Sequence, residues 1–349
     1  MVVRLGGDVE SKWLGISGLA IGAVVALGLV SVSRVVARPL RAPESSASFA
    51  PALLDPDSLA SATPEERIEL ARRLLGMNAA FLAALPIPQK ITLCGTSIPL
   101  DRADVREAIA YELILSVGKP TMPLLWTRRA PNVLPLIEAQ LKARQLPDDL
   151  KYLPMIESDL RWTARSPANA LGLWQFVEGT GRRYGLRIDS FVDQRLDPDS
   201  ATDAGLRYLD DLHREFDDWL LALAAYNAGE GAVGRALADQ GRRSYFDLFL
   251  PYETRRYVPR LIAAKLVYEQ PEAYGLVRMT PLYRTSYRFV ELTIHEAQGD
   301  LREVARKQGL DYAALRLANP QLKSAKVPKG KYRVRVADRG DGAPVMEAP

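Results

Sequence analysis

One segment restricts the fold of this chain more than any other. The eight residues from Trp219 to Tyr226 read Trp-Leu-Leu-Ala-Leu-Ala-Ala-Tyr, so a helix built from them is apolar on every side and needs other helices around it. Asp217 or Asp218 can cap the start of this helix, and Gly229 can end it. The sequence therefore predicts a mainly helical domain that encloses this helix.

The segments before it carry helical patterns as well. In residues 202–216 apolar side chains recur one turn apart, which predicts an amphipathic helix. Two further helices are expected over 101–115 and 132–144. Thr63 followed by Pro64 is a typical helix start, with the threonine as the cap and the proline in the first helical position.

The pattern changes after residue 285. Two segments there alternate apolar residues with others, which is typical of strands, and two helical stretches, 299–309 and 311–318, lie between them. The alternating apolar residues are Val290, Leu292 and Ile294 in the first segment and Tyr332, Val334 and Val336 in the second. The sequence predicts a small β-α-α-β unit.

The N-terminal region contains twenty residues without a charge, from Leu14 to Ser33. About 20 apolar residues in a helix cross a bilayer core of roughly 30 Å, so we expect one N-terminal transmembrane helix. A cleaved signal peptide is the alternative, because Val35-Val36-Ala37 resembles a cleavage site. Residues 38–63 are rich in Pro, Ala and Ser and are expected to form a linker.

Several chemistries find no support in the sequence. Cys94 is the only cysteine, which excludes an internal disulfide and a CxxC metal or redox pair. Neither His213 nor His295 belongs to an HExxH motif, and the glycine-rich nucleotide-binding motifs are absent. We therefore expect no metal and no cofactor.

Charge is unevenly distributed along the chain. The formal net charge is +4, and the whole excess lies in residues 285–349, which hold 12 basic and 8 acidic side chains. A run of basic residues within this region either faces an anionic polymer or forms the solvated face of a strand. Nucleic acid is not an expected partner. Six basic residues follow one another there without an acid between them: Lys323, Lys326, Lys329, Lys331, Arg333 and Arg335.

One carboxylate, Glu157, ends the apolar run that begins at Tyr152. Burial disfavours the charged form of a carboxyl and raises its pKa, which suits a general acid near neutral pH. A surface residue at the end of a helix is the alternative reading. Two later segments, 166–175 and 226–229, add amides and phenols, the groups that hydrogen-bond the N-acetyl and hydroxyl groups of sugars.

Four motifs occur in a fixed order, and together they resemble the transglycosylase SLT family of lytic murein transglycosylases over about residues 95–270. The motifs are Glu157-Ser158, the run Ser166-Pro-Ala-Asn-Ala-Leu-Gly-Leu-Trp-Gln175, Tyr226-Asn227-Ala228-Gly229 and Glu253-Thr254-Arg255-Arg256-Tyr257-Val258. Residues 176–186 and the stretch Arg195-Leu196-Asp197-Pro198 are typical of the membrane-bound D type within that family.

This resemblance implies a goose-type lysozyme-like helical fold and a peptidoglycan substrate. It implies that Glu157 protonates the glycosidic oxygen between MurNAc and GlcNAc and then acts as a base on the MurNAc C6 hydroxyl, which attacks C1 and leaves a 1,6-anhydro end. No second catalytic carboxylate is visible in the sequence, because Asp159 points away if the segment is helical. The residues expected to line the saccharide groove are Ser166, Gln175, Tyr226, Asn227 and Tyr257.

Asn169 departs from the family pattern, and Pro154 is unusual inside a helix. Asn169 stands where the family usually has Gly, which suits a backbone with positive φ because Asn tolerates that region better than most residues. Pro154 lies three residues before the acid and is expected to kink its helix.

The C-terminal unit resembles a LysM wall-binding module. The similarity rests on Gly299-Asp300-Leu301, Val304-Ala305, Gly309-Leu310, Leu315 and Asn319-Pro320. The family's Thr after Asp300 is missing, so sugar binding and a purely packing role are both open for this unit.

These patterns predict an envelope protein with peptidoglycan glycan strands as its partner, held on the periplasmic side of the cytoplasmic membrane by its N-terminal segment. A hydrolase of the same fold and a wall-binding scaffold with a disabled site are the alternatives. The expected divisions are an anchor or signal segment (1–37), a linker (38–63), a helical extension (64–144), the SLT domain (145–275), a LysM-like module (285–337) and a tail (338–349).

Overall fold

The computed structural model describes residues 79–279 and 287–337, which belong to one compact unit spanning Glu65–Pro349. The expected membrane span at Leu14–Ser33, the linker and the helix start at Thr63 lie outside the described residues. Within the described ranges, no helix is both long enough and apolar enough to cross a bilayer.

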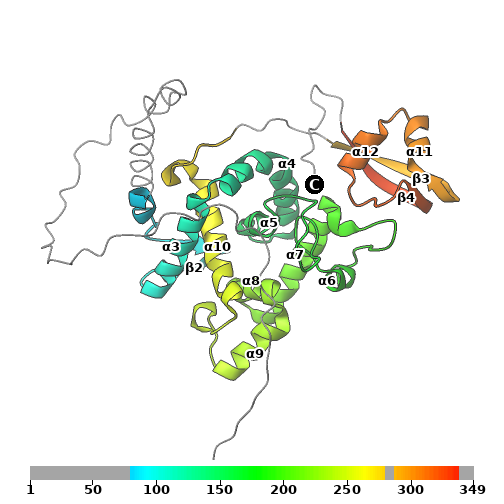
Figure 1. The fold of residues 1–349 in the computed structure, drawn as a ribbon. Coiled ribbons are helices and arrows are strands. Elements are labelled where there is room, and N and C mark those ends of the chain that lie inside the picture. Colours follow the sequence, from blue (N-terminus) through cyan, green and yellow to red (C-terminus); the bar gives the residue numbers. More distant parts are fainter. Residues whose placement is uncertain (1–78, 280–286, 338–349) are drawn as a thin grey trace, which may run out of the picture. The chain divides into compact units, whose positions relative to one another are not determined.

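The described part is mainly helical (Figure 1). Its α-helices before residue 280 include α3 (Ala103–Gly118), α4 (Thr121–Arg144), α5 (Leu153–Ser158), α6 (Glu178–Arg183), α7 (Pro198–Phe216), α8 (Trp219–Ala228), α9 (Glu230–Gln240) and α10 (Tyr252–Glu269). Short 3-10 turns add η1 (Asp148–Tyr152), η2 (Gln194–Leu196), η3 (Tyr245–Asp247) and η4 (Pro271–Tyr274). Strands β1 (Thr92–Leu93) and β2 (Thr96–Ser97) form a small antiparallel pair before α3.

Helix α8 is the enclosed helix that its apolar composition predicts. Figure 1 shows it between α7 and α10, and it contacts both of them and α9. Its side chains from Ala222 to Ala225 are completely buried. Asp218 caps its start, because the Asp218 carboxylate accepts hydrogen bonds from the backbone of Leu220 and Leu221 at 2.7 and 3.0 Å.

Helix α7 holds the loop that contains Trp174 in place. The Trp174 ring is completely buried against α7, and its Nε1 donates a 3.0 Å hydrogen bond to Thr202 Oγ1. A Cβ on Gly205 would lie 2.7 Å from the Trp174 ring. Only glycine therefore lets the indole pack this closely against the helix.

The C-terminal module (residues 287–337) has the predicted β-α-α-β order. Strand β3 (Tyr287–Asp300) pairs antiparallel with β4 (Lys326–Ala337), and α11 (Leu301–Lys307) and α12 (Tyr312–Ala318) connect them. Leu292 lies opposite Tyr332 in this pair, and both side chains are buried in the core of the module.

Candidate active site

The segment that carries the candidate acid is short and closely held. Pro154 occupies the first turn of α5, where a missing N–H is tolerated, so the predicted kink is wrong and the proline instead starts the helix. Asp159, with a positive φ of 54°, ends it. Ser158 Oγ lies 3.0 Å from Pro154 O and 2.8 Å from Leu173 O, and its single proton is shared between these two carbonyl oxygens, which ties α5 to the following loop.

Glu157 is half-buried at the end of α5, and the Tyr257 hydroxyl donates a hydrogen bond to its Oε1. Burial raises the pKa of the Glu157 carboxyl, and the negative charge of Glu253 raises it further. The Tyr257 hydrogen bond and the positive charge of Arg260 oppose this, but the pKa stays above its ordinary value. Glu157 therefore keeps a proton at higher pH than an exposed glutamate does.

The ends of α8 and α10 meet beside the acid. The Tyr226 hydroxyl donates a 2.7 Å hydrogen bond to Trp174 O. Burial and the nearby charge of Glu157 raise the pKa of Tyr226, so its hydroxyl stays a donor. Asn227 Oδ1 accepts a 2.9 Å hydrogen bond from Thr254 Oγ1, which joins the two helices.

The active-site loop (residues 166–176) holds its shape with its own polar groups. Ser166 Oγ accepts from Ala170 N at 3.0 Å, and Gln175 Nε2 donates to Gly172 O at 2.7 Å. Among the described residues, neither side chain hydrogen-bonds Glu157. Asn169 has a φ of 58°, as expected from the replacement of the family's Gly.

The structure thus brings Tyr257 into hydrogen-bond contact with the acid and Tyr226 close enough to be influenced by its charge, with Asn227 joined to the same helices. Ser166 and Gln175 lie in the loop that Ser158 and Tyr226 attach to the site through the backbone of Leu173 and Trp174.

Sequence reasoning missed two features of the site. Arg260 Nη2 pairs with Glu253 Oε1 at 2.5 Å, and both charges act on Glu157. The seven-residue spacing was the available signal, because in a helix such as α10 it places two residues on one face.

The second missed feature is a row of tyrosines leading away from Tyr226. The Tyr226 ring centroid lies 5.3 Å from that of Tyr208, which lies 4.9 Å from that of Tyr184. The Arg183 guanidinium is 5.3 Å from the ring centroids of both Tyr184 and Tyr208. The three tyrosines come from separate segments, so no local sequence pattern predicts that their rings form a row.

No group of three or more potential metal ligands occurs within the described residues. Cys94 is a free, buried thiol.

Comparison with known proteins shows what this part of the chain is similar to. Residues 135–249 match the family model of the Transglycosylase SLT domain. The chain is 34% identical over 204 residues to membrane-bound lytic murein transglycosylase D of Escherichia coli K12, an alignment that covers 57% of this chain and 44% of that protein. The chain therefore aligns with less than half the length of this curated relative.

Two other proteins are similar over shorter stretches or more distantly. The peptidoglycan transglycosylase gp16 of Escherichia phage T7 is 34% identical over 132 residues, which cover 37% of this chain and 10% of the phage protein. The crystal structure of the 70 kDa soluble lytic transglycosylase of Escherichia coli gives a TM-score of 0.35 at 22% identity, with 50% of this chain and 33% of that chain covered.

Proposed function

We propose that the chain is a peptidoglycan lytic transglycosylase that cleaves the β-1,4 bond between MurNAc and GlcNAc and leaves a 1,6-anhydro-MurNAc end. The observation that carries this proposal is the half-buried Glu157 carboxyl with raised pKa, hydrogen-bonded by Tyr257 and set within the segment that matches the SLT family model. The names of the related transglycosylases agree with it.

The reaction needs only one carboxyl group that first gives and then takes a proton. Protonated Glu157 gives its proton to the glycosidic oxygen as the bond from that oxygen to MurNAc C1 breaks. The resulting carboxylate takes the proton of the MurNAc C6 hydroxyl, whose oxygen forms the new bond to C1. Glu157 ends protonated, no water is consumed, and the substrate supplies the nucleophile.

The neighbouring groups prepare Glu157 for this cycle. Tyr257 orients the carboxyl through its hydroxyl, and the buried position keeps the proton available at a higher pH than in an exposed glutamate. Tyr257 is completely buried behind the acid, whereas we assign Ser166, Gln175, Tyr226 and Asn227, which are all partly exposed, to the groove that holds the sugar rings. Their amide, hydroxyl and phenol groups suit the N-acetyl and hydroxyl groups of peptidoglycan.

A hydrolase of the same fold is the second candidate, and Glu253 is the observation that favours it. Its charge acts on Glu157, so a second carboxylate is near the acid. The ion pair with Arg260 engages one of its oxygens at 2.5 Å, which disfavours a role as a base. Glu253→Gln should lose little activity in a lytic transglycosylase and most activity in a hydrolase that uses this carboxylate.

The cell envelope is the proposed location, because the substrate is the cell wall and a related protein is named as membrane-bound. We propose that the uncharged segment Leu14–Ser33 anchors the chain with residues 38–349 on the periplasmic side. We also propose that the C-terminal module is LysM-like and contributes to glycan binding.

Glu157→Gln tests the proposal with little change in shape. The amide cannot donate the proton, and general acid catalysis alone contributes about 10²- to 10⁴-fold, so release of muropeptides from purified sacculi should fall by at least that factor. Glu107→Gln, an exposed position on α3, is the matched control and should retain full activity. Release by Glu157→Gln close to that of the wild type would refute the assignment and leave a wall-binding scaffold as the better account.

A further inference from the structure

A short stretch of the helical domain, the docking segment (residues 189–199), contacts the C-terminal module, as do Trp162 and Arg187. Val192 of this segment is buried in the core of the module and forms an isolated antiparallel bridge with Leu322. The backbones add two hydrogen bonds of 2.8 Å, from Asp193 N to Gln321 O and from Lys323 N to Phe191 O. The docking segment therefore completes the core of the module.

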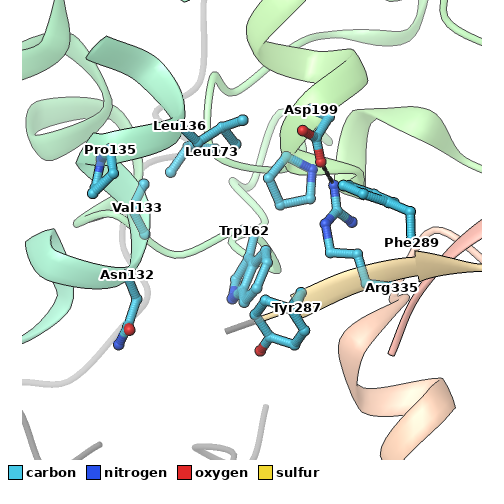
Figure 2. A pocket seen from close by; sticks show the side chains of 11 residues that line it. Asn132, Val133, Pro135, Leu136, Trp162, Leu173, Asp199, Tyr287, Phe289 and Arg335 are labelled. Carbon is cyan, nitrogen blue, oxygen red and sulfur yellow. Dashed lines mark hydrogen bonds and ion pairs between the residues drawn. The ribbon is translucent and has the colours of Figure 1, made fainter. Parts of the chain in front are cut away.

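An ion-pair group holds the other side of this contact. Arg335 on β4 is 4% exposed, and its guanidinium pairs with Asp197 at 2.6 Å and with Asp199. Figure 2 shows the Arg335–Asp199 pair at the edge of a cavity of about 330 Å³, where Trp162 faces Tyr287 of β3. A guanidinium buried this deeply is stable only with its carboxylates in place.

The same docking segment reaches the active-site loop through Arg195. The side chains of Arg195 and Asp193 are both buried, and two hydrogen bonds of 2.9 and 2.7 Å join them. Arg195 Nη1 donates to the carbonyl oxygens of Asn169 and Phe176 at 3.2 and 3.3 Å. One guanidinium thus binds the loop that carries Ser166 and Gln175 at two points.

Backbone packing strengthens this link. A Cβ on Gly172 would lie 1.8 Å from Arg195 O, so the loop and the docking segment are in direct backbone contact. Gly172 also has a φ of 80°, which glycine adopts without strain. A displacement of the docking segment would therefore move the loop.

We propose that the C-terminal module positions the active-site loop, with Arg195 as the positioning residue that connects the two. The inference rests on the proposed function for its catalytic consequence, while the mechanical link stands on the contacts alone. Releasing the module frees the docking segment, which lets the Asp193–Arg195 pair shift and the loop lose its register beside Glu157. The module then contributes to turnover even on substrates too short to bind it.

Arg335→Ala tests the link, because it breaks the two ion pairs between the module and the docking segment without touching the active site. On a short soluble glycan, kcat should fall about 10-fold, since small misplacements of reacting groups cost up to about 10²-fold, while KM changes less than twofold. Hydrogen exchange should rise at the loop amides of Leu171, Gly172 and Phe176, which are hydrogen-bonded within the folded domain. Arg333→Ala is the matched control, since it removes the same charge from an exposed position two residues away.

The controls separate the possible outcomes. If Arg335→Ala fails to fold, Arg335→Lys takes its place in the test. Lysine keeps the charge but loses the forked geometry, so kcat should fall by less than the roughly 10-fold drop expected for Arg335→Ala. Normal kcat and unchanged exchange in residues 166–176 for a folded Arg335→Ala protein would overturn the proposal. If the wild type releases no product, the proposed function fails, and the exchange measurement still decides the link.

Discussion

Glu157 is subject to opposing influences, and their balance sets its protonation. Burial and Glu253 raise the pKa of the carboxyl, whereas the Tyr257 hydroxyl and Arg260 lower it. The sequence indicated Glu157 through the apolar run before it, and the family motifs indicated Tyr257. The contribution of Arg260 was not foreseen, because it depends on how α5 and α10 meet, which no local pattern reports.

A first prediction concerns the stability cost of this raised pKa. The folded protein holds the Glu157 proton more tightly than the unfolded chain, so stability is fully retained below the ordinary value of 4.5 and is lost as pH rises through the raised pKa. A glutamine side chain carries no ionisable proton, so Glu157→Gln should have a higher Tm than the wild type at about pH 7, with the difference vanishing near pH 4. Thermal unfolding at both pH values measures this, and equal Tm values at pH 7 would contradict the burial of the acid.

A second prediction follows from the Tyr257 hydroxyl. Tyr257→Phe removes a hydrogen bond that lowers the pKa of Glu157, so the alkaline limb of the kcat/KM profile should move to higher pH. Loss of orientation should also lower kcat by about 10-fold. Tyr274→Phe, which removes a phenol bound to Pro86 O, should change neither. If the alkaline limb of Tyr257→Phe stays at the pH of the wild type, the limb reports the pKa of a group other than Glu157.

At the scale of elements, composition predicted the enclosed helix well and the site segments poorly. Helix α8 was predictable because an all-apolar helix has only one stable environment. Helix α7 begins at Pro198, earlier than the expected 202, since Asp197 caps it and Pro198 takes its first turn. Pro154 was misjudged because a proline starts a helix as readily as it kinks one, and the preceding 3-10 turn was not visible in the sequence.

A third prediction tests how α7 holds the active-site loop. Gly205→Ala places a Cβ 2.7 Å from the buried Trp174 ring, and overpacking of this kind typically costs about 1–3 kcal/mol. The free energy of unfolding in urea should fall by that amount. Gly234→Ala is the control, because a Cβ there meets nothing within 4 Å. Equal stability of Gly205→Ala and the wild type would show that the indole can move away without cost.

At the scale of the whole molecule, the C-terminal basic run has more than one role. The sequence allowed either a surface for an anionic polymer or a solvated strand face. The structure pairs Lys331 with Glu291 at 3.0 Å and buries Arg335 against the docking segment. The β-α-α-β order was predictable from alternation, but the burial of Val192 in the core of the module was not, because it joins residues more than 90 positions apart.

The chemistry of the released glycan ends tests the account most directly. Purified sacculi digested with the full-length protein should yield soluble muropeptides that end in 1,6-anhydro-MurNAc, lighter by one water than the reducing products of a hydrolase, as measured by mass spectrometry. Glu157→Gln should yield neither. Reducing MurNAc ends from the wild type, or anhydro ends in equal amount from Glu157→Gln, would contradict the claim that Glu157 alone transfers the proton and the substrate supplies the nucleophile.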